Sequence, residues 1–160
     1  RGNYMAGFEW KYNLSGGRPL IHTLYAKDTE TLTKGDIMNV ETGEVDLAVT
    51  QDTALIGAMQ GADNPDDEKN SSGVRTPGVV YCTDSTTIVK VIVNPDAVYA
   101  TADANARQPG ATLDIAGATG AQTLAASANT EFVVAERKRA TADDTRVLII
   151  ATLHPYTKSQ

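Results

Sequence analysis

The stretch at residues 37–49, with the sequence IMNVETGEVDLAV, decides the fold class of this chain. Its second half alternates: Val45, Leu47 and Val49 fall on one face of an extended segment, which is typical of a half-buried strand. Gly43 lies in the short polar segment before it, where glycine is typical of a tight turn. The stretch therefore predicts a β-hairpin in which residues 37–40 pair with residues 45–49.

More strands are expected on both sides of this hairpin. Within residues 87–93, Val89, Val91 and Val93 share one face, while Lys90 and Ile92 share the other. The run at residues 146–153 is apolar on both faces, so we expect it in the centre of a sheet. The other predicted strands are short apolar or β-branched runs bounded by turn residues, at residues 20–26, 54–59, 79–82 and 131–136.

Two segments differ from this pattern. Residues 100–129 are rich in Ala, which favours a helix, but Pro109 and three glycines oppose it, because an interior Gly costs a helix about 1 kcal/mol and Pro about 3 kcal/mol relative to Ala. We expect irregular structure with short strands there. Residues 63–73 contain no apolar side chain, which predicts a solvated loop over residues 61–78.

Eight or so short strands with closely spaced turn signals predict an all-β fold, either a small β-barrel or a β-sandwich. The chain has 160 residues, enough for one hydrophobic core, so we expect a single domain over residues 1–160. We expect it to be nearly complete, although it opens at Arg1. Residues 1–19 are expected to form an extended N-terminal arm, and residues 20–160 the β core with its long loop at 61–78.

The composition excludes several classes of partner. Hydrophobic residues make up 41% of the chain and charged residues 21%, which is ordinary for a globular protein. A formal net charge of -6 disfavours nucleic acid, because phosphate binding needs clustered Lys and Arg. Cys82 is the only cysteine, which excludes an intrachain disulfide and a cysteine-based zinc site. No apolar run approaches the ~20 residues that span a bilayer, so we expect neither a membrane-spanning segment nor a membrane as a partner.

The N-terminal arm concentrates aromatic side chains in a short segment. Tyr4, Phe8, Trp10 and Tyr12 all lie within it, among Gly and Pro residues that show no sustained period. Large apolar side chains need a surface to pack on. Either the arm folds back over its own core, or these four residues contact a neighbouring subunit or another protein.

The sequence predicts neither a catalytic residue nor a cofactor. A nucleophile needs a base within reach, and no motif of a known site surrounds His22, His154 or Cys82. Residues 117–120 are glycine-rich but lack the lysine of a phosphate loop. Asp63, Asp66 and Asp67 are interpreted as a solvated turn, with a cation site as the alternative, and the basic residues 137–139 are interpreted as a second solvated turn. We therefore expect no enzyme.

Several motifs, taken in order, resemble those of the capsid decoration (cement) proteins of tailed bacteriophages. Residues 33–40 read TKGDIMNV, Gly43-Glu44-Val45 follows, and residues 55–59 read LIGAM, in which the family's glycine permits close packing of backbones. Further on, residues 91–99 read VIVNPDAVY and look like a Pro-Asp-Ala stretch of a subset of these proteins. The resemblance covers residues 18–100. The long acidic loop at 61–78 departs from the short connection that the family often has.

This resemblance implies a β-tulip-like fold and a structural virion protein. Proteins of this family bind the outer surface of the mature capsid, contact the major capsid protein, often form homotrimers and stabilise the head. Such a protein is made in the host cytoplasm and ends on the virion. Tyr4, Phe8, Trp10 and Tyr12 would then be the contacts with the capsid or with a neighbouring subunit.

Two other functions stay open at this point. A phage tail or fibre component with a receptor- or carbohydrate-binding role would gather exposed aromatic residues at one groove. A trimeric all-β nucleotide hydrolase, such as deoxyuridine triphosphatase, has a similar size, but the glycine-rich nucleotide motifs of that family are not evident here.

Overall fold

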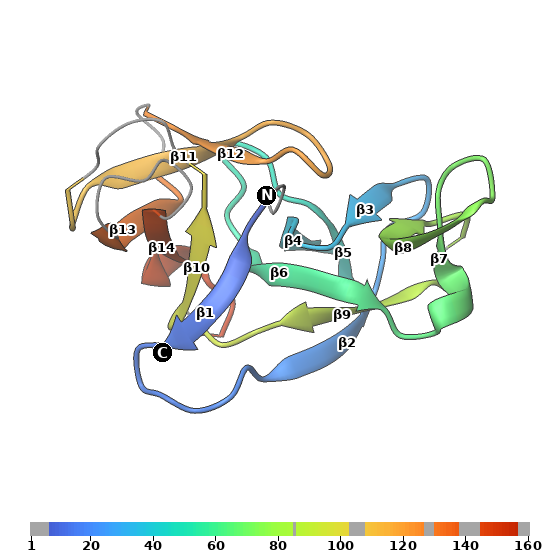
Figure 1. Cartoon of the computed structure of the whole chain (residues 1–160), viewed down its shortest axis with the longest axis horizontal. Coiled ribbons are helices and arrows are strands. Elements are labelled where there is room, and N and C mark those ends of the chain that lie inside the picture. The colour runs from blue at the N-terminus through green and yellow to red at the C-terminus, as the bar shows by residue number, and fades with distance from the viewer. Residues whose placement is uncertain (1–6, 85, 103–107, 127–129, 138–144, 157–160) are drawn as a thin grey trace, which may run out of the picture.

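The computed structural model describes residues 7–84, 86–102, 108–126, 130–137 and 145–156, with no side chain described for residue 137. Three β-sheets make up this part of the chain, so the predicted all-β fold is confirmed. Its helical elements are two single 3-10 turns, η1 (Pro65–Asp67) and η2 (Ala151–Leu153). Figure 1 shows the sheets side by side, with β10, β13 and β14 at one end and β3, β7 and β8 at the other.

The largest sheet has six strands, and every neighbouring pair is antiparallel. Strand β14 lies between β10 and β13, so the predicted central position of the last strand is confirmed. The strands in sheet order are β1 (Glu9–Asn13), β10 (Ala97–Thr101), β14 (Thr145–Ile149), β13 (Phe132–Arg137), β11 (Thr112–Ala116) and β12 (Thr123–Ala125).

The second sheet has five antiparallel strands, and the third has three strands, of which β7 and β8 run parallel. In sheet order, the five are β2 (Ile21–Tyr25), β9 (Ile88–Ile92), β6 (Leu55–Ala62), β4 (Ile37–Glu41) and β5 (Glu44–Leu47). The three are β3 (Thr31–Thr33), β8 (Arg75–Tyr81) and β7 (Glu68–Lys69).

Of the two predicted architectures, the sandwich describes this fold and the barrel does not. The two edges of the five-stranded sheet do approach each other, since Ala26 and Val45 form a single parallel bridge and Lys27 N donates to Val45 O at 2.9 Å. A closed barrel needs a continuous ladder between its first and last strands. The single bridge provides no such ladder, and the sheet stays open.

The five-stranded sheet is the middle layer of the molecule, with a hydrophobic core on each side. One core contains Phe8, Tyr99 and Phe132 and lies against the six-stranded sheet. The other contains Leu32, Val80 and Cys82 and lies against the three-stranded sheet. The middle strands supply both cores, and this explains why their residues are apolar on both faces.

Strand β9 illustrates this division. Val89, Val91 and Val93 enter the core beside the three-stranded sheet, whereas Ile92 enters the core beside the six-stranded sheet. The predicted division of residues 87–93 into two faces is therefore confirmed.

The predicted hairpin of residues 37–40 and 45–49 is confirmed as far as Leu47, with Val40 opposite Val45 in the register of β4 and β5. Thr42 and Gly43 connect the strands with φ values of 50° and 85°, and two positive φ values are the signature of a type I′ turn. The prediction for Val49 was wrong, because β5 ends at Leu47 and the chain then turns. Val49 N is bonded to the Asp52 carboxylate at 2.8 Å, and its side chain is exposed.

The loop predicted at residues 61–78 contains more structure than expected. Glu68 and Lys69 form β7, and β8 begins at Arg75, inside the predicted loop. The 3-10 turn η1 is capped by Asn64, whose side-chain oxygen accepts from Asp66 N at 3.1 Å. The sequence did not predict β7 or the start of β8, because neither segment carries the alternating apolar residues that are typical of a half-buried strand.

The Ala-rich segment at residues 100–129 contains β11 and β12 within its described part, which confirms short strands in place of a helix. The last predicted strand is shorter than expected. It ends at Ile149, and residues 151–153 form η2 instead of extending the sheet.

Two motifs of the sequence meet in the interior. Gly57 of β6 has a φ of 150°, and a Cβ placed on it would collide with the carbonyl oxygen of Ile92 and lie 2.8 Å from the Tyr99 hydroxyl. The Tyr99 hydroxyl also accepts from Ala58 N at 3.3 Å. Gly57 therefore permits the close approach of β6 and β9, as expected for the glycine in the LIGAM segment.

Buried polar side chains join the sheets at the start of β4. The Asp36 carboxylate accepts from Thr33 N, the Thr119 hydroxyl and Gly120 N at 2.7–2.9 Å. Burial raises the pKa of Asp36, although these three hydrogen bonds oppose the rise. Gln122 accepts from Ile37 N at 2.6 Å and donates to Ala48 O at 3.0 Å. These bonds satisfy backbone groups that would otherwise be buried without partners.

Candidate interaction surface

The N-terminal segment folds back onto the six-stranded sheet, which was the first of the two alternatives for the predicted arm. Tyr4 lies outside the described residues. Phe8 is buried and its ring stacks on that of Phe132, with centroids 5.1 Å apart. Trp10 is half-buried against the same core and donates from Nε1 to the Asn13 side chain at 3.0 Å. Residues 9–13 form β1, an edge strand paired with β10.

Tyr12 has a polar environment. Its hydroxyl donates to the Glu136 carboxylate at 2.5 Å, and the Arg146 guanidinium lies 5.9 Å from its ring centroid. Arg146 and Glu136 also form an ion pair at 3.8 Å. Burial raises the pKa of the Tyr12 hydroxyl, and the bond to Glu136 adds to this rise. Among the described predicted contacts, Phe8 thus serves the core of its own chain, while Trp10 and Tyr12 keep partly exposed surface.

Exposed apolar residues gather elsewhere, around β2. Seven large apolar side chains of the described residues are classed as exposed, and five of them lie on β2, on the loop before it, or on the C-terminal segment that contacts it. We call this group the β2 surface, and it surrounds the strand edge: Ile21 and Tyr25 lie on one face of β2, whereas Tyr156 lies against His22 on the other. Its members are Leu14 (61% exposed), Leu20 (51%), Ile21 (44%), Tyr25 (52%) and Tyr156 (43%).

The loop at residues 14–20 is fixed to the turn between β9 and β10. Leu14 N donates to Asp96 O at 3.0 Å, and Ser15 N donates to the Asp96 carboxylate at 2.8 Å. Leu20 N donates to the Asn94 side chain at 2.6 Å. The apolar side chains of this loop are therefore presented to solvent by an anchored backbone. The loop and β2 run together along the lower margin of Figure 1.

Strand β2 is an edge strand of the middle sheet, paired only with β9 through its ladder. Val93 N donates to Leu20 O, and Ala26 N donates to Thr87 O, each at 2.9 Å, so the even-numbered residues point their backbone groups toward β9. In an antiparallel ladder the alternate residues point the other way. Ile21 and Thr23 thus direct backbone groups to the outer edge, where Ile21 also exposes its side chain.

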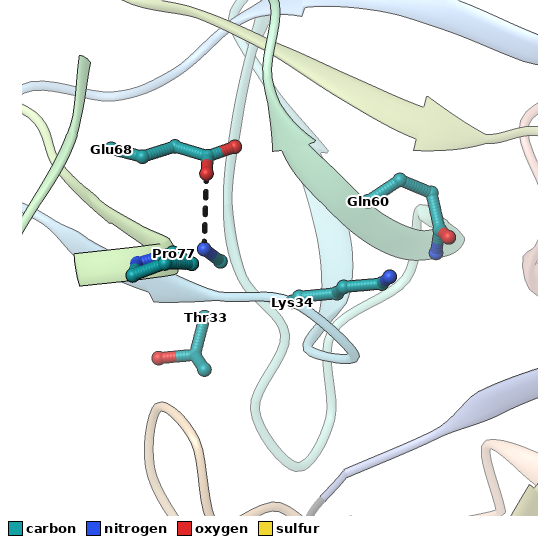
Figure 2. A pocket seen from close by; sticks show the side chains of 6 residues that line it. Thr33, Lys34, Gln60, Glu68 and Pro77 are labelled. Atoms are coloured by element: carbon teal, nitrogen blue, oxygen red, sulfur yellow. Dashed lines mark hydrogen bonds between the residues drawn. The ribbon is translucent and has the colours of Figure 1, made fainter. Parts of the chain in front are cut away.

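A shallow cavity of about 360 Å³ lies between the middle and small sheets. Figure 2 shows its lining, with Lys34 and Gln60 on one side and Glu68 on the other. The Glu68 carboxylate accepts from Gly78 N and Ala62 N at 3.1 Å, and the bond from Gly78 is the main cause that lowers its pKa. Thr33, Pro77 and Gly78 complete the lining. The described residues of this lining include no aromatic ring on which a sugar could stack.

The three side chains considered for catalysis lie apart from this cavity. Burial raises the pKa of the Cys82 thiol to about 12, so the thiolate that a nucleophile needs is disfavoured. His154 Nε2 bonds to Ile56 O at 2.9 Å, and His22 Nδ1 bonds to the Tyr156 hydroxyl at 3.0 Å.

The described residues contain no group of three or more His, Cys, Asp or Glu side chains that could hold a metal ion, the Asp63–Asp67 region included. No helix among them has the length and apolar character that crossing a membrane requires.

No protein-family model, curated protein or solved structure matches this chain. The resemblance to decoration proteins therefore depends on the motifs quoted above. Sequence reasoning selected Phe8, Trp10 and Tyr12 as contact residues and did not select the residues around β2. The residues from Leu20 to Tyr25 predict a strand. Its position at the edge of a sheet, which exposes its apolar side chains, follows only from the neighbouring strands.

Proposed function

We propose that this chain is a capsid decoration protein of a tailed bacteriophage and that its β2 surface contacts the capsid. The observation that carries this proposal is the collection of five exposed apolar side chains around one edge strand. Exposed apolar groups that cluster in this way mark sites of protein association. The sequence motifs supply the class of partner, the major capsid protein.

On this proposal the protein acts by binding and needs neither catalysis nor a cofactor. A protein that binds only the mature lattice stabilises that lattice by mass action. Many copies on a symmetric shell add their individual contributions, even when each contact is weak. Self-association into a homotrimer is part of the proposal, because three linked copies engage the lattice together.

Co-sedimentation with heads tests this function. Purified protein is mixed with expanded and with unexpanded heads of the phage that encodes it, and bound protein is measured against concentration. We expect saturable binding to expanded heads alone. Equal binding to both forms, or binding to neither, contradicts a decoration role.

A matched pair of variants tests the surface. Ile21→Lys places a charge on the β2 surface, whereas Val74→Lys makes the same change at a residue that is 60% exposed on a different loop. We expect Ile21→Lys to weaken binding to expanded heads by about tenfold or more, equivalent to about 1.4 kcal/mol, and Val74→Lys to bind as the unaltered protein does. Equal affinity of the two variants would place the contact elsewhere.

A further inference from the structure

Both histidines of the chain contact one tyrosine. The chain contains two histidines, and the ring centroids of His22 and His154 lie 5.8 Å and 5.5 Å from that of Tyr156. His22 belongs to β2, whereas His154 and Tyr156 belong to the C-terminal segment that follows η2. The segment at residues 151–156 is thus attached to the middle sheet through these three rings.

The hydrogen bonds of His154 determine its protonation state. Nε2 lies 2.9 Å from Ile56 O, and a carbonyl oxygen only accepts, so Nε2 carries the proton. Tyr156 N donates to Nδ1 at 3.1 Å, so Nδ1 offers a lone pair. Only the neutral imidazole with its proton on Nε2 satisfies both bonds. A second proton would place an N–H on Nδ1 directly against the N–H of Tyr156.

The surroundings of His154 agree with a neutral ring. His154 is fully buried, and this burial lowers the pKa of its imidazole. The hydrogen bond to Ile56 O opposes the decrease. Among the described residues, the elements packed against His154 bring few titratable groups. Strand β6 carries none in its sequence, β2 carries His22 and Tyr25, and the segment itself carries Tyr156. Of these, Tyr156 faces His154 directly, and His22 lies beyond the Tyr156 ring.

We propose that His154 is an acid-sensitive clasp that holds residues 151–156 against β6 and β2 and releases them when Nδ1 becomes protonated. The inference goes beyond the proposed function and does not depend on it, since it concerns the free protein. Release of the segment would change the β2 surface, because Tyr156 is one of its five members. The Tyr156 hydroxyl is hydrogen-bonded to His22 of β2.

The sign of the pH dependence follows from the lowered pKa. Above the ordinary histidine pKa of about 6.5, both the closed and the open segment hold a neutral His154, and the clasp is at full strength. As the pH falls through that value, the open segment takes up a proton that the closed segment resists. The closed state is therefore lost progressively between the ordinary pKa and the lower pKa of the closed state.

Hydrogen exchange measured on the free protein tests the clasp. Protection factors, which remove the intrinsic pH dependence of exchange, are compared for the C-terminal segment at about pH 7.5 and about pH 5. We expect them to be lower at about pH 5 than at about pH 7.5, because the pKa of His154 is lowered in the closed segment and the open segment binds the proton more readily. Carbon-13 shifts of the His154 ring, followed by NMR through the same range, should report the Nε2-protonated tautomer at the higher pH.

Two variants distinguish the contribution of His154 to the pH dependence from that of His22. His154→Gln keeps an amide donor for Ile56 O but does not titrate, so the protection of the segment should no longer depend on pH. His22→Gln leaves His154 in place and should retain the loss at low pH. If His154→Gln fails to fold, the measurements on the unaltered chain decide. Equal protection at both pH values, or a His154 ring protonated on Nδ1 at the higher pH, would refute the clasp whatever the result with heads.

Discussion

At Gly57 the backbone of β6 passes so close to β9 that a side chain has no room. We expect Gly57→Ala to lower the free energy of unfolding by about 3 kcal/mol or more, because the methyl group collides with the Ile92 carbonyl and the φ of 150° is strained for any residue with a Cβ. Chemical denaturation followed by circular dichroism measures this change.

A second glycine supplies the control for this prediction. Gly73 also has a positive φ, 82°, but a Cβ there would meet nothing within 4 Å. Gly73→Ala should therefore cost only the backbone strain, about 1–2 kcal/mol. If the two variants lose equal stability, the collision at Gly57 is relieved by movement of β9 and the close approach is not essential.

Gly43 was predictable as a turn residue because its role is local. The close packing of Gly57 was expected only from the motif resemblance, because the groups that it approaches, Ile92 and Tyr99, lie far along the chain. Asp36 and Gln122 were not identified as buried polar links, because the partners that join them to another sheet, Gly120 for Asp36 and Ile37 for Gln122, lie more than 80 positions away in the sequence. Phe8 was recognised as a side chain in need of a surface, but the sequence contains no sign that Phe132 provides it.

Among the elements, the β4–β5 hairpin contains a turn whose sequence can be improved. Thr42 occupies the first position of the type I′ turn with a φ of 50°, a conformation that β-branched residues disfavour and Asn tolerates. We expect Thr42→Asn to raise the free energy of unfolding by about 1 kcal/mol. Ser72→Asn, at an exposed turn residue without a positive φ, should leave it unchanged. Denaturation midpoints of the two variants check this difference, and equal midpoints would contradict it.

Elements were predictable from the sequence where their side chains alternate. The hairpin, β9 and β14 all carry apolar residues at the spacing of a strand, and each was located correctly, although β5 and β14 end before the predicted residues 49 and 153. Strands β7 and β8 were missed or shortened because Lys69, Arg75 and Pro77 give no apolar alternation. Their hydrogen bonds come from pairing across the small sheet, with partners such as Leu32 opposite Val80. Only the tertiary fold supplies those partners.

For the whole molecule, the sequence predicted an all-β fold but not the arrangement of its layers. Strand β6 is buried almost throughout, and a run of buried residues looks the same between two cores as it does within one. The position of β2 at the edge of the middle layer could not be predicted either, because the residues of a strand do not indicate how many neighbours it has. The predicted interaction site was consequently placed on the N-terminal segment, whereas most exposed apolar residues lie around β2.

The shared middle layer predicts that both cores unfold together. The chain contains one tryptophan and one cysteine, and they report on opposite sides of the middle sheet. Trp10 packs against the core of Phe8 and Phe132, and Cys82 is fully buried in the core of Leu32 and Val80. Because β4, β6 and β9 contribute to both cores, loss of either core removes the support of the other.

We therefore expect Trp10 fluorescence and the rate of Cys82 labelling by a thiol reagent to give one common denaturation midpoint. Phe132→Ala removes a side chain from the Trp10 side and should lower both midpoints by the same amount, corresponding to about 3–5 kcal/mol. Leu32→Ala, on the Cys82 side, should do likewise, with a loss of about 2–5 kcal/mol. A midpoint that shifts for one probe alone would mean that the two cores are separate folding units, joined by the middle sheet but not stabilised by each other.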